Sequence, residues 1–205
     1  MRSVAPGFEE KGARFGVKVM TPGESKSPAY LKRNPFGRVP TSVHGDFALD
    51  ESRAILRYLD RILPGPRLTP QDPQAEARIN QLCGTTDWYV MPQITIGITF
   101  GRLAAPKIGR PVEERQIEAS LPGAGRCIAE IARLLGDRPF LAGDAVSIAD
   151  LLLGSHLAFF AQTAESAEII EPHRALAAWI DRMNARPSFR NTVPARLAAK
   201  AATKA

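Results

Sequence analysis

NPFGRVP at residues 34–40 and LDESRAI at residues 49–55 are the two stretches that decide the fold of this chain. The proline after Val39 favours an extended backbone at Val39, and only an X-Pro bond is commonly cis. A cis bond here would turn the N–H and C=O groups of Val39 outward, free to pair with an extended ligand. The first stretch therefore predicts a ligand-binding loop that leads into a strand.

The second stretch opens a helix with Glu51 and Ser52. A helix N-terminus carries unpaired N–H groups and a partial positive charge, so it accepts a carboxylate. The Ser52 hydroxyl adds a donor, and the Glu51 carboxylate can accept from an ammonium group. Either stretch alone would be interpreted as a turn proline or an ordinary helix cap. Together, eleven positions apart, they favour a site for an α-amino acid head group, which bears both charges.

Residues 27–58, SPAYLKRNPFGRVPTSVHGDFALDESRAILRY, resemble the glutathione-binding lobe of glutathione transferases, in particular the phi type and its bacterial relatives. The resemblance implies that the backbone of Val39 pairs with the cysteinyl unit of glutathione, and that Glu51 and Ser52 hold the γ-glutamyl head. The expected glutathione-binding residues are Lys26, Arg38, Val39, Pro40, Glu51 and Ser52.

The glycine end of glutathione is assigned by the same resemblance. Lys26 matches a lysine that reaches the glycine carboxylate, and the polar side chain of Arg38 is expected near the ligand. Ser25 stands where the family often has a histidine, so the contacts at this end differ in part from the family pattern.

The second half of the chain carries a structural motif. FLAGD at residues 140–144 and SIAD at residues 147–150 resemble the folding motif in the sixth helix of the family. Its physical basis is a capping box, in which Ser147 accepts from the N–H of Asp150 and Asp150 reaches back to Ser147. ARPSF at residues 185–189 matches the usual end of the helical lobe, so the resemblance extends over residues 4–192.

The implied fold is an α/β, thioredoxin-like N-terminal lobe, truncated at its start, followed by an all-α C-terminal helical bundle. We assign residues 1–64 to the first lobe, 65–73 to a proline-rich linker and 74–205 to the helical domain. Apolar periodicity predicts strands over residues 15–20, 39–43 and 46–49, and helices over residues 51–63, 74–102 with Pro92 inside, 111–135, 147–162, 172–185 and 188–199.

The start of the chain is short for this architecture. Glu9-Glu10-Lys11-Gly12 matches the end of the family's first helix, and only eight residues precede it. A strand needs about five residues and a helix about ten. We therefore expect the first strand and the activating Ser, Tyr or Cys to be missing, since Ser3 lies past the usual position. The alternatives are a translation start upstream of Met1 and a degenerate, non-catalytic protein.

Composition argues against other classes of function. The formal net charge is +6, but basic residues are mixed with acidic ones except in the tail, residues 196–204, so no nucleic-acid partner is expected. Cys83 and Cys127 are isolated, which predicts neither a disulfide nor a metal site. No apolar run approaches the roughly 20 residues of a membrane span, and the N-terminus lacks a signal sequence. No membrane partner and a cytoplasmic location are expected.

The leading hypothesis is an enzyme that uses glutathione as co-substrate to conjugate, or to reduce, a small hydrophobic electrophile. The resemblance implies that the electrophile lies against the long helix over residues 74–102, where Trp88, Tyr89 and Phe100 are candidate liners. The alternative is a non-catalytic glutathione-binding or protein-interaction module of the same fold. A homodimer is expected from the resemblance, with Arg53 and Arg78 as candidate interface charges.

Overall fold

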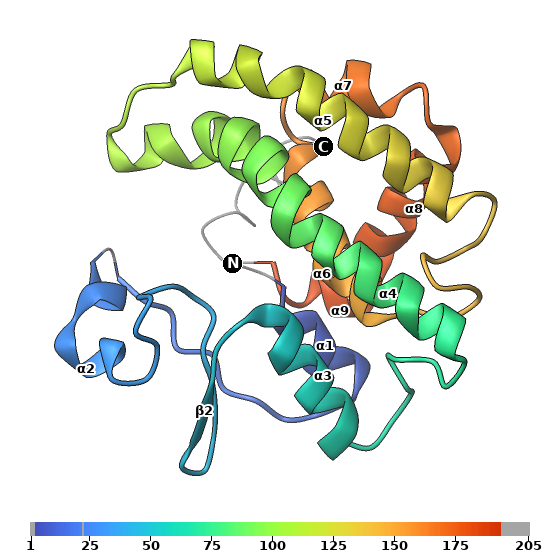
Figure 1. Cartoon of the computed structure of the whole chain (residues 1–205). Coiled ribbons are helices and arrows are strands. Elements are labelled where there is room, and N and C mark those ends of the chain that lie inside the picture. Colours follow the sequence, from blue (N-terminus) through green and yellow to red (C-terminus); the bar gives the residue numbers. More distant parts are fainter. Residues whose placement is uncertain (1–2, 22, 194–205) are drawn as a thin grey trace.

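The computed structural model describes residues 3–21 and 23–193 of the chain. Residues 3–63, which we call the N-terminal region, combine short helices with one β-hairpin, and residues 73–193, the helical region, contain helices throughout (Figure 1). The elements of the N-terminal region are α1 (Ala5–Glu10), η1 (Glu24–Lys26), α2 (Pro28–Leu31), β1 (Ser42–His44), β2 (Phe47–Leu49) and α3 (Ser52–Ile62).

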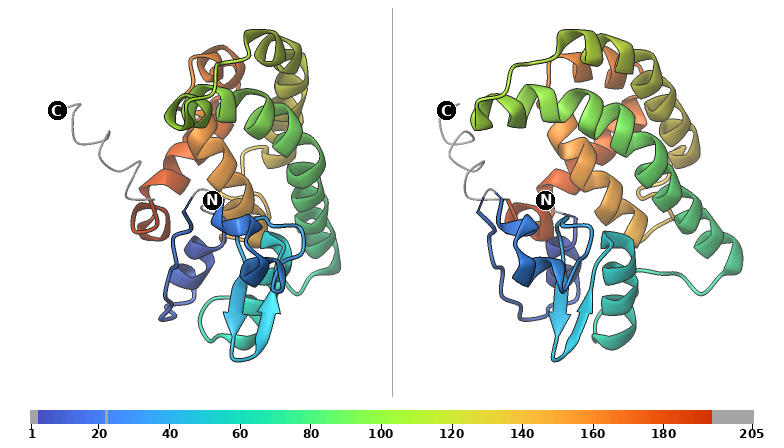
Figure 2. Two further views of the ribbon diagram at one scale, coloured as in Figure 1. Left: turned by 90° about the vertical axis from the view of Figure 1, so that its left-hand side faces the viewer. Right: turned by 60° about the vertical axis from the view of Figure 1, so that its left-hand side comes forward.

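The hairpin lies where the sequence predicts it. Strands β1 and β2 pair in antiparallel register, with Ser42 opposite Leu49 and His44 opposite Phe47, and Gly45 turns the chain at a φ of 60°. The Tyr58 hydroxyl of α3 lies 2.9 Å from Nδ1 of His44, which fixes the hairpin against this helix. Both views of Figure 2 place the hairpin at one end of the molecule and α5 at the other.

The strand predicted over residues 15–20 is wrong. Residues 13–21 form neither helix nor strand, and within the described residues the sheet consists of β1 and β2 alone. Val17 and Val19 are exposed, and Phe15 stacks on Phe8 with ring centroids 4.7 Å apart. The alternation of apolar residues is present in the sequence, but a strand also needs a neighbouring strand to satisfy its backbone groups, and this segment pairs with no strand in the described part of the chain.

The helical region begins with a long helical rod. Helix α4 (Pro73–Thr85) continues into η2 (Thr86–Ala104) and then η3 (Ala105–Ile108), so the helix predicted over residues 74–102 is confirmed. The turns of η2 are wider than those of an α-helix, and the N–H of Ala105 donates to the carbonyl of Phe100 five residues earlier. Pro92 lies inside this widened segment, where its missing N–H removes one hydrogen bond.

The remaining helices follow the predictions with one addition and one shortening. Helix α7 was not predicted, because it has six residues and no side-chain cap marks its start. The helix predicted over residues 188–199 ends at Arg190, and its last part, like the basic tail, lies outside the described residues. The helices are α5 (Glu114–Leu135), α6 (Ile148–Phe160), α7 (Glu165–Ile170), α8 (Arg174–Ala185) and α9 (Pro187–Arg190). No described helix has both the length and the apolar character needed to cross a membrane.

Helix α6 is the centre of the helical region, and the predicted capping box at its start is confirmed. Every residue of α6 except Phe159 is buried. The Ser147 hydroxyl accepts the N–H of Asp150, and the Asp150 carboxylate accepts the N–H of Ser147. The other carboxylate oxygen of Asp150 accepts the N–H of Leu141 at 2.9 Å and the indole N–H of Trp179 at 2.8 Å. One buried carboxylate thus joins the start of α6 to α8 and to the segment before α6.

Buried polar contacts attach α1 to the rest of the molecule. The Lys11 ammonium, almost fully buried, donates to the Asp60 carboxylate at 3.1 Å and to the Pro66 carbonyl at 3.0 Å. The Glu10 carboxylate forms two hydrogen bonds of 2.8 Å with Arg186 and accepts from the Ser188 hydroxyl. These contacts hold the N-terminal region against both the linker and the end of the helical region.

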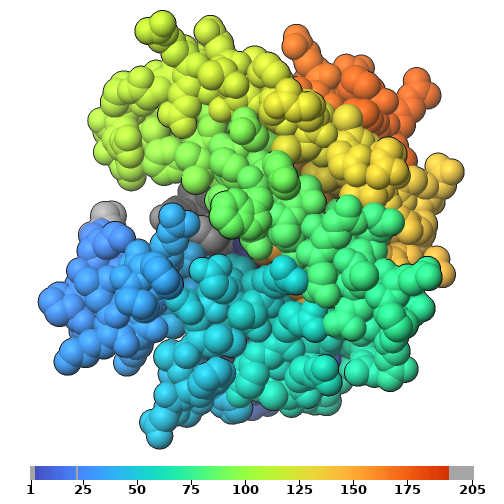
Figure 3. Space-filling model, in the orientation of Figure 1, coloured from blue at the N-terminus to red at the C-terminus, as the bar shows by residue number. Residues whose placement is uncertain are grey.

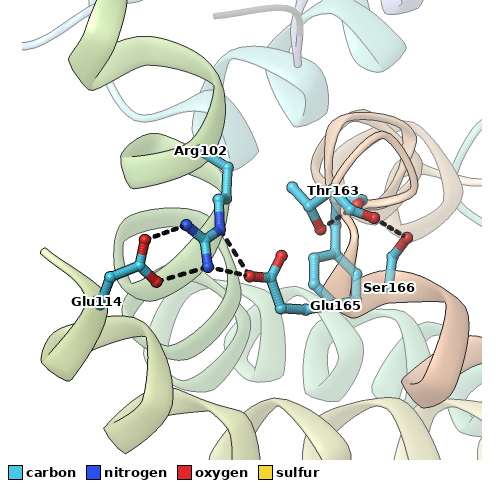
Figure 4. Close-up of polar contacts among 6 residues, drawn as sticks. Arg102, Glu114, Thr163, Glu165 and Ser166 are labelled. Atoms are coloured by element: carbon cyan, nitrogen blue, oxygen red, sulfur yellow. Dashed lines mark hydrogen bonds and ion pairs between the residues drawn. The ribbon is translucent and has the colours of Figure 1, made fainter. Parts of the chain in front are cut away.

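A third polar cluster closes the far end of the bundle. Arg102 at the end of η2 donates to both oxygens of Glu114 in α5 and to one oxygen of Glu165 in α7 (Figure 4). The second oxygen of Glu165 is buried without a hydrogen-bond partner among the described residues. The single guanidinium therefore fixes three helix ends relative to one another.

Candidate functional site

The loop before β1 carries the first part of the site. The Val39–Pro40 peptide bond is cis, the conformation that the sequence makes possible at this proline. Val39 is half-buried, and neither its N–H nor its C=O has a hydrogen-bond partner within residues 3–21 and 23–193. A backbone donor and a backbone acceptor are thus presented at one residue, the arrangement that an extended peptide ligand requires.

Two side chains that sequence reasoning missed hold this loop in place. The Tyr30 hydroxyl donates to the Arg38 carbonyl at 2.6 Å and lies 2.8 Å from the Thr41 hydroxyl. The buried Asn34 amide donates to the same carbonyl at 3.0 Å and accepts the N–H of Phe36. A buried asparagine must find hydrogen-bond partners, so its position inside NPFG was the available signal. The loop around Val39 is therefore held at the Arg38 carbonyl before it and at the Thr41 side chain after it, by Tyr30 of α2 and by Asn34.

The second part of the site is the start of α3. Glu51 is the N-cap residue with a φ of 62° and a ψ of 112°, and Ser52 is the first helical residue. The Glu51 carbonyl accepts the N–H of Ile55 at 2.9 Å, but no side chain among the described residues caps the N–H groups of the first turn. Free N–H groups at a helix start attract an anion. The Glu51 side chain is exposed and the Ser52 side chain half-buried, so a ligand can reach both.

Two further charged residues stand beside Glu51. Arg53 donates from its guanidinium to Asn80 of α4 at 2.7 Å, so this candidate interface charge is engaged within the chain. Burial raises the pKa of Asp87 in η2, the positive charge of Arg53 opposes that rise, and the negative charge of Glu51 adds to it. Sequence spacing gives no signal for this group, because Glu51 and Asp87 are brought near each other only when α3 packs beside the rod.

Lys26 and Arg38 flank the loop on its exposed side. The Lys26 ammonium donates to the Phe36 carbonyl at 3.1 Å and lies over Gly37, where a Cβ atom would be 2.8 Å from it. The Arg38 side chain is exposed and has no hydrogen-bond partner among the described residues. The structure thus gathers Lys26 and Arg38 around the loop, and it joins none of the six predicted ligand residues to another by a side-chain hydrogen bond.

The three aromatic candidates lie on η2. Trp88 is 79% exposed, Tyr89 61% and Phe100 37%, and no ring contact joins any two of them within the described chain. The Arg110 guanidinium lies 5.8 Å from the centre of the Phe100 ring. Figure 3 shows the surface hollowed between the blue and cyan residues of the N-terminal region and the green residues of this rod.

The serine, cysteine and histidine side chains that could take part in thiol or proton-transfer chemistry elsewhere in the described chain, Ser3, Cys83, Cys127 and His156, are buried. Ser3, directly before α1, is 1% exposed. Burial raises the pKa of the Cys83 thiol to about 12, and it also raises the pKa of Cys127. Burial lowers the pKa of His156 to about 4, and its ring accepts or donates at 2.8 Å from the Thr95 hydroxyl. The described residues contain no cluster of three or more His, Cys, Asp or Glu side chains able to hold a metal ion.

The comparisons with known proteins agree on one family. A family model of the glutathione S-transferase N-terminal domain matches residues 5–61, and one of the C-terminal domain matches residues 114–182. Glutathione S-transferase F9 of Arabidopsis thaliana is 32% identical over 90% of this chain and 87% of its own length. Glutathione S-transferase theta-2B of Homo sapiens is 36% identical over 80% of this chain and 66% of its own length.

A solved structure shows the same arrangement of elements. Glutathione S-transferase I from maize, in complex with an atrazine glutathione conjugate, superposes with a TM-score of 0.82 at 26% identity and covers 100% of this chain and 93% of its own. The small hairpin with its flanking helices is thus the thioredoxin-like part, and α4 to α9 are the helical part of one known fold. The chain belongs to the glutathione S-transferase family.

Proposed function

We propose that this chain binds glutathione across the cis-proline loop and the start of α3. The open first turn of α3, with the Ser52 hydroxyl, accepts the α-carboxylate of the γ-glutamyl head, and Glu51 accepts from its ammonium group. The free N–H and C=O of Val39, which precedes the cis bond to Pro40, pair with the cysteinyl unit. The observation that carries the proposal is this pairing of an uncapped helix start with an unpartnered backbone.

We propose that the charged side chains near the loop bind the glycine end of glutathione. Lys26 and Arg38 are the cations beside the loop, so they attract the glycine carboxylate. Arg53 and Glu51 both act electrostatically on Asp87, so we propose that these three charges contribute to the potential around the ammonium group. The maize structure that superposes on this chain holds a glutathione conjugate, which supports a peptide thiol as the ligand.

The reaction that we propose is attack of the bound thiol on a small hydrophobic electrophile. The thiol loses its proton, its sulfur forms a bond to carbon, and the leaving group departs with its electron pair. With a peroxide, two glutathione molecules give an alcohol, water and the disulfide. A thiol with a pKa near 8.5 is mostly protonated at neutral pH, and we assign its activation to no side chain of this chain. The exposed Trp88, Tyr89 and Phe100 of η2 supply the apolar wall for the electrophile.

A homodimer in the cytoplasm completes the proposal. The resemblance to glutathione transferases supports the dimer. The mass of the chain in solution, measured by light scattering, tests the dimer directly. A mass of one chain at micromolar concentration would contradict it.

Retention on glutathione resin and conjugation of 1-chloro-2,4-dinitrobenzene test the proposal together. We expect Ser52→Ala and Glu51→Gln to weaken retention at least tenfold, because each removes a contact to the γ-glutamyl head. Glu118→Gln, an exposed glutamate of α5, serves as the matched control and keeps the parent affinity. Retention without conjugation would support the alternative, a non-catalytic glutathione-binding module, and loss of neither property in the two variants would contradict the site.

A further inference from the structure

A second cavity lies away from the glutathione site. It has a volume of about 270 Å³ and opens between the end of α3, the loop over residues 63–72 and the start of α4, a stretch of chain that can be followed in Figure 1. None of the six proposed glutathione residues lines it. Its charged lining residues are Arg57, Asp60, Arg61, Arg67 and Glu76.

The positive charges of the cavity follow from the sequence of α3. Arg53, Arg57 and Arg61 are spaced four residues apart, so they form one row along the helix. Like charges at this spacing repel each other. Arg67 in the loop brings a third guanidinium to the cavity beside Arg57 and Arg61. An anion between these groups would replace repulsion by attraction.

The two carboxylates of the lining are already engaged. Asp60 accepts from the buried Lys11 ammonium at 3.1 Å and from the N–H of Leu68 at 2.9 Å. Glu76 accepts from one guanidinium nitrogen of Arg57 at 2.7 Å. Arg61 and Arg67 have no partner among the described residues. With Lys11 balancing Asp60 and Arg57 balancing Glu76, two guanidinium charges stay unbalanced at the cavity.

The walls of the cavity are held in place before any ligand arrives. Arg57 also donates to the Asn80 amide oxygen at 2.9 Å, which fixes its guanidinium against α4. The loop is fixed by two hydrogen bonds, because Asp60 accepts the N–H of Leu68 and Lys11 donates to the carbonyl of Pro66. A fixed donor loses less conformational freedom on binding, so Arg57 favours affinity, whereas the exposed side chains of Arg61 and Arg67 become ordered on the ligand.

Size and charge together select the ligand. Sites for organic molecules usually have volumes of about 300 Å³ or more, so this cavity suits a small ion or a compact polar molecule. The guanidinium fork matches phosphate oxygens in a two-point hydrogen bond. We infer that the α3–α4 cavity binds a phosphate dianion, either inorganic phosphate or the phosphate group of a small ester, through Arg61 and Arg67 with Arg57 as the fixed wall. This inference requires nothing of the glutathione site.

The test is titration of the full chain with inorganic phosphate and with glycerol 3-phosphate at constant ionic strength, by calorimetry and by phosphorus NMR line width. We expect one saturable site per chain, unchanged by saturating glutathione. If glycerol 3-phosphate binds more tightly than inorganic phosphate, the ligand is a phosphate ester. If the two bind equally, the site recognises the phosphate group alone. Both results support the site.

Matched variants separate the cavity from general charge effects. Arg61→Gln with Arg67→Gln should weaken phosphate binding at least tenfold, whereas Arg115→Gln with Arg126→Gln removes the same charge from exposed positions of α5 and should leave it unchanged. Circular dichroism checks that both double variants are folded. No saturable binding to the parent chain, equal weakening in both pairs, or displacement of phosphate by glutathione would overturn the inference.

Discussion

The larger apolar core is one continuous cluster that runs through α4, η2, α5, α6 and α8 of the helical region and takes in Leu56 of α3, whereas the small cluster within the N-terminal region has Val4, Ile55 and Leu59 as its buried members. The N-terminal region compensates with polar anchors, above all the buried Lys11 and the paired Glu10. Burial of apolar surface contributes about 25 cal/mol of free energy per Å², so the large cluster can stabilise the helical region by itself. The small cluster of the N-terminal region depends on its contacts with the linker and the helical region.

The comparison explains where the proposed binding residues sit. All six lie in the region with the smaller core, on a loop and at a helix start. Segments with little buried apolar surface open at low free energy, and binding loops are commonly placed on such segments while a rigid neighbour supports them. The helical region is that neighbour, and the two regions should therefore respond differently to substitution, to pH and to ligand.

The largest effect is expected at Asp150, which holds the helical region together. Asp150→Ala leaves the Leu141 N–H, the Ser147 N–H and the Trp179 indole N–H buried without their acceptor. Each unsatisfied buried donor costs about 1–3 kcal/mol, so we expect the free energy of unfolding to fall by about 4 kcal/mol or more. Urea denaturation followed by tryptophan fluorescence measures it. Asp144→Ala, at an exposed position six residues earlier, is the control and should change the midpoint little.

Lys11→Met should loosen the N-terminal region selectively. The substitution keeps the length of the side chain but leaves the Asp60 carboxylate without its ammonium partner, and breaking a buried ion pair costs about 3 kcal/mol. Hydrogen exchange should then speed up in α1 and α3 while α6 keeps its protection. Lys32→Met, at an exposed position of the same region, serves as control. Equal loss of protection in α6 would show that the two regions unfold as one unit.

The helical region could be predicted from sequence more fully than the N-terminal region, for physical reasons. The SIAD capping box and the apolar periodicity of α6 are local signals, and they gave the helix and its cap. The hairpin could also be predicted, and the Val39–Pro40 bond could be identified as a possible cis bond, because proline and glycine act on their own neighbours. The strand over residues 15–20 was not, since strand formation depends on a partner that the local pattern does not report.

The electrostatic surroundings of the candidate site escaped prediction for the same reason. The charges of Arg53 and Glu51 act on Asp87 of η2, and Asn80 links Arg53 to α4. The spacing of residues in the sequence does not predict these contacts between α3 and the helices α4 and η2. The anchors Tyr30 and Asn34 are close to Val39 in sequence, but their role depends on the fold of the loop.

Acid should weaken the helical region through His156. Its folded pKa is about 4 because of burial, against an ordinary value of 6.5. Between these values the unfolded chain takes up a proton that the folded chain does not, so stability is complete above pH 6.5 and falls as the pH drops towards 4. At 1.36 kcal/mol for each pKa unit, the loss is up to about 3 kcal/mol. Denaturation series at several pH values measure it.

His156→Asn supplies the control for this pH dependence. Asparagine keeps a polar atom near the Thr95 hydroxyl and has no proton to gain in this range. The slope of stability against pH between 6.5 and 4 should be smaller in the variant by about one proton. An unchanged slope would assign the acid sensitivity to carboxylates such as Glu10. Burial raises the pKa of Glu10, but the hydrogen bonds to Arg186 and Ser188 and the charge of Arg186 together lower it further, so the pKa lies below its ordinary value.

The smallest effect on stability, and the sharpest on the comparison, is expected at Glu51. The starts of α6 and α3 differ in their caps: Ser147 and Asp150 cap the first, whereas no side chain within residues 3–21 and 23–193 caps the second. Glu51 also holds a φ of 62°, which favours glycine. Backbone strain of this kind costs about 1 kcal/mol, so Glu51→Gly should leave stability unchanged or raise it by about that amount.

Glutathione binding should move the other way in the same variant. Glu51→Gly removes the carboxylate that we assign to the ammonium group, so retention on glutathione resin should fall although the fold is as stable as before. Glu51→Gln keeps the positive φ and removes only the charge, which separates the two effects. Parent-level retention by the glycine variant, or a clear loss of its stability, would show that the open start of α3 serves the fold rather than the ligand. Opposite changes in stability and binding would show that this helix start is kept strained and uncapped for the ligand, while the start of α6 is closed for the fold.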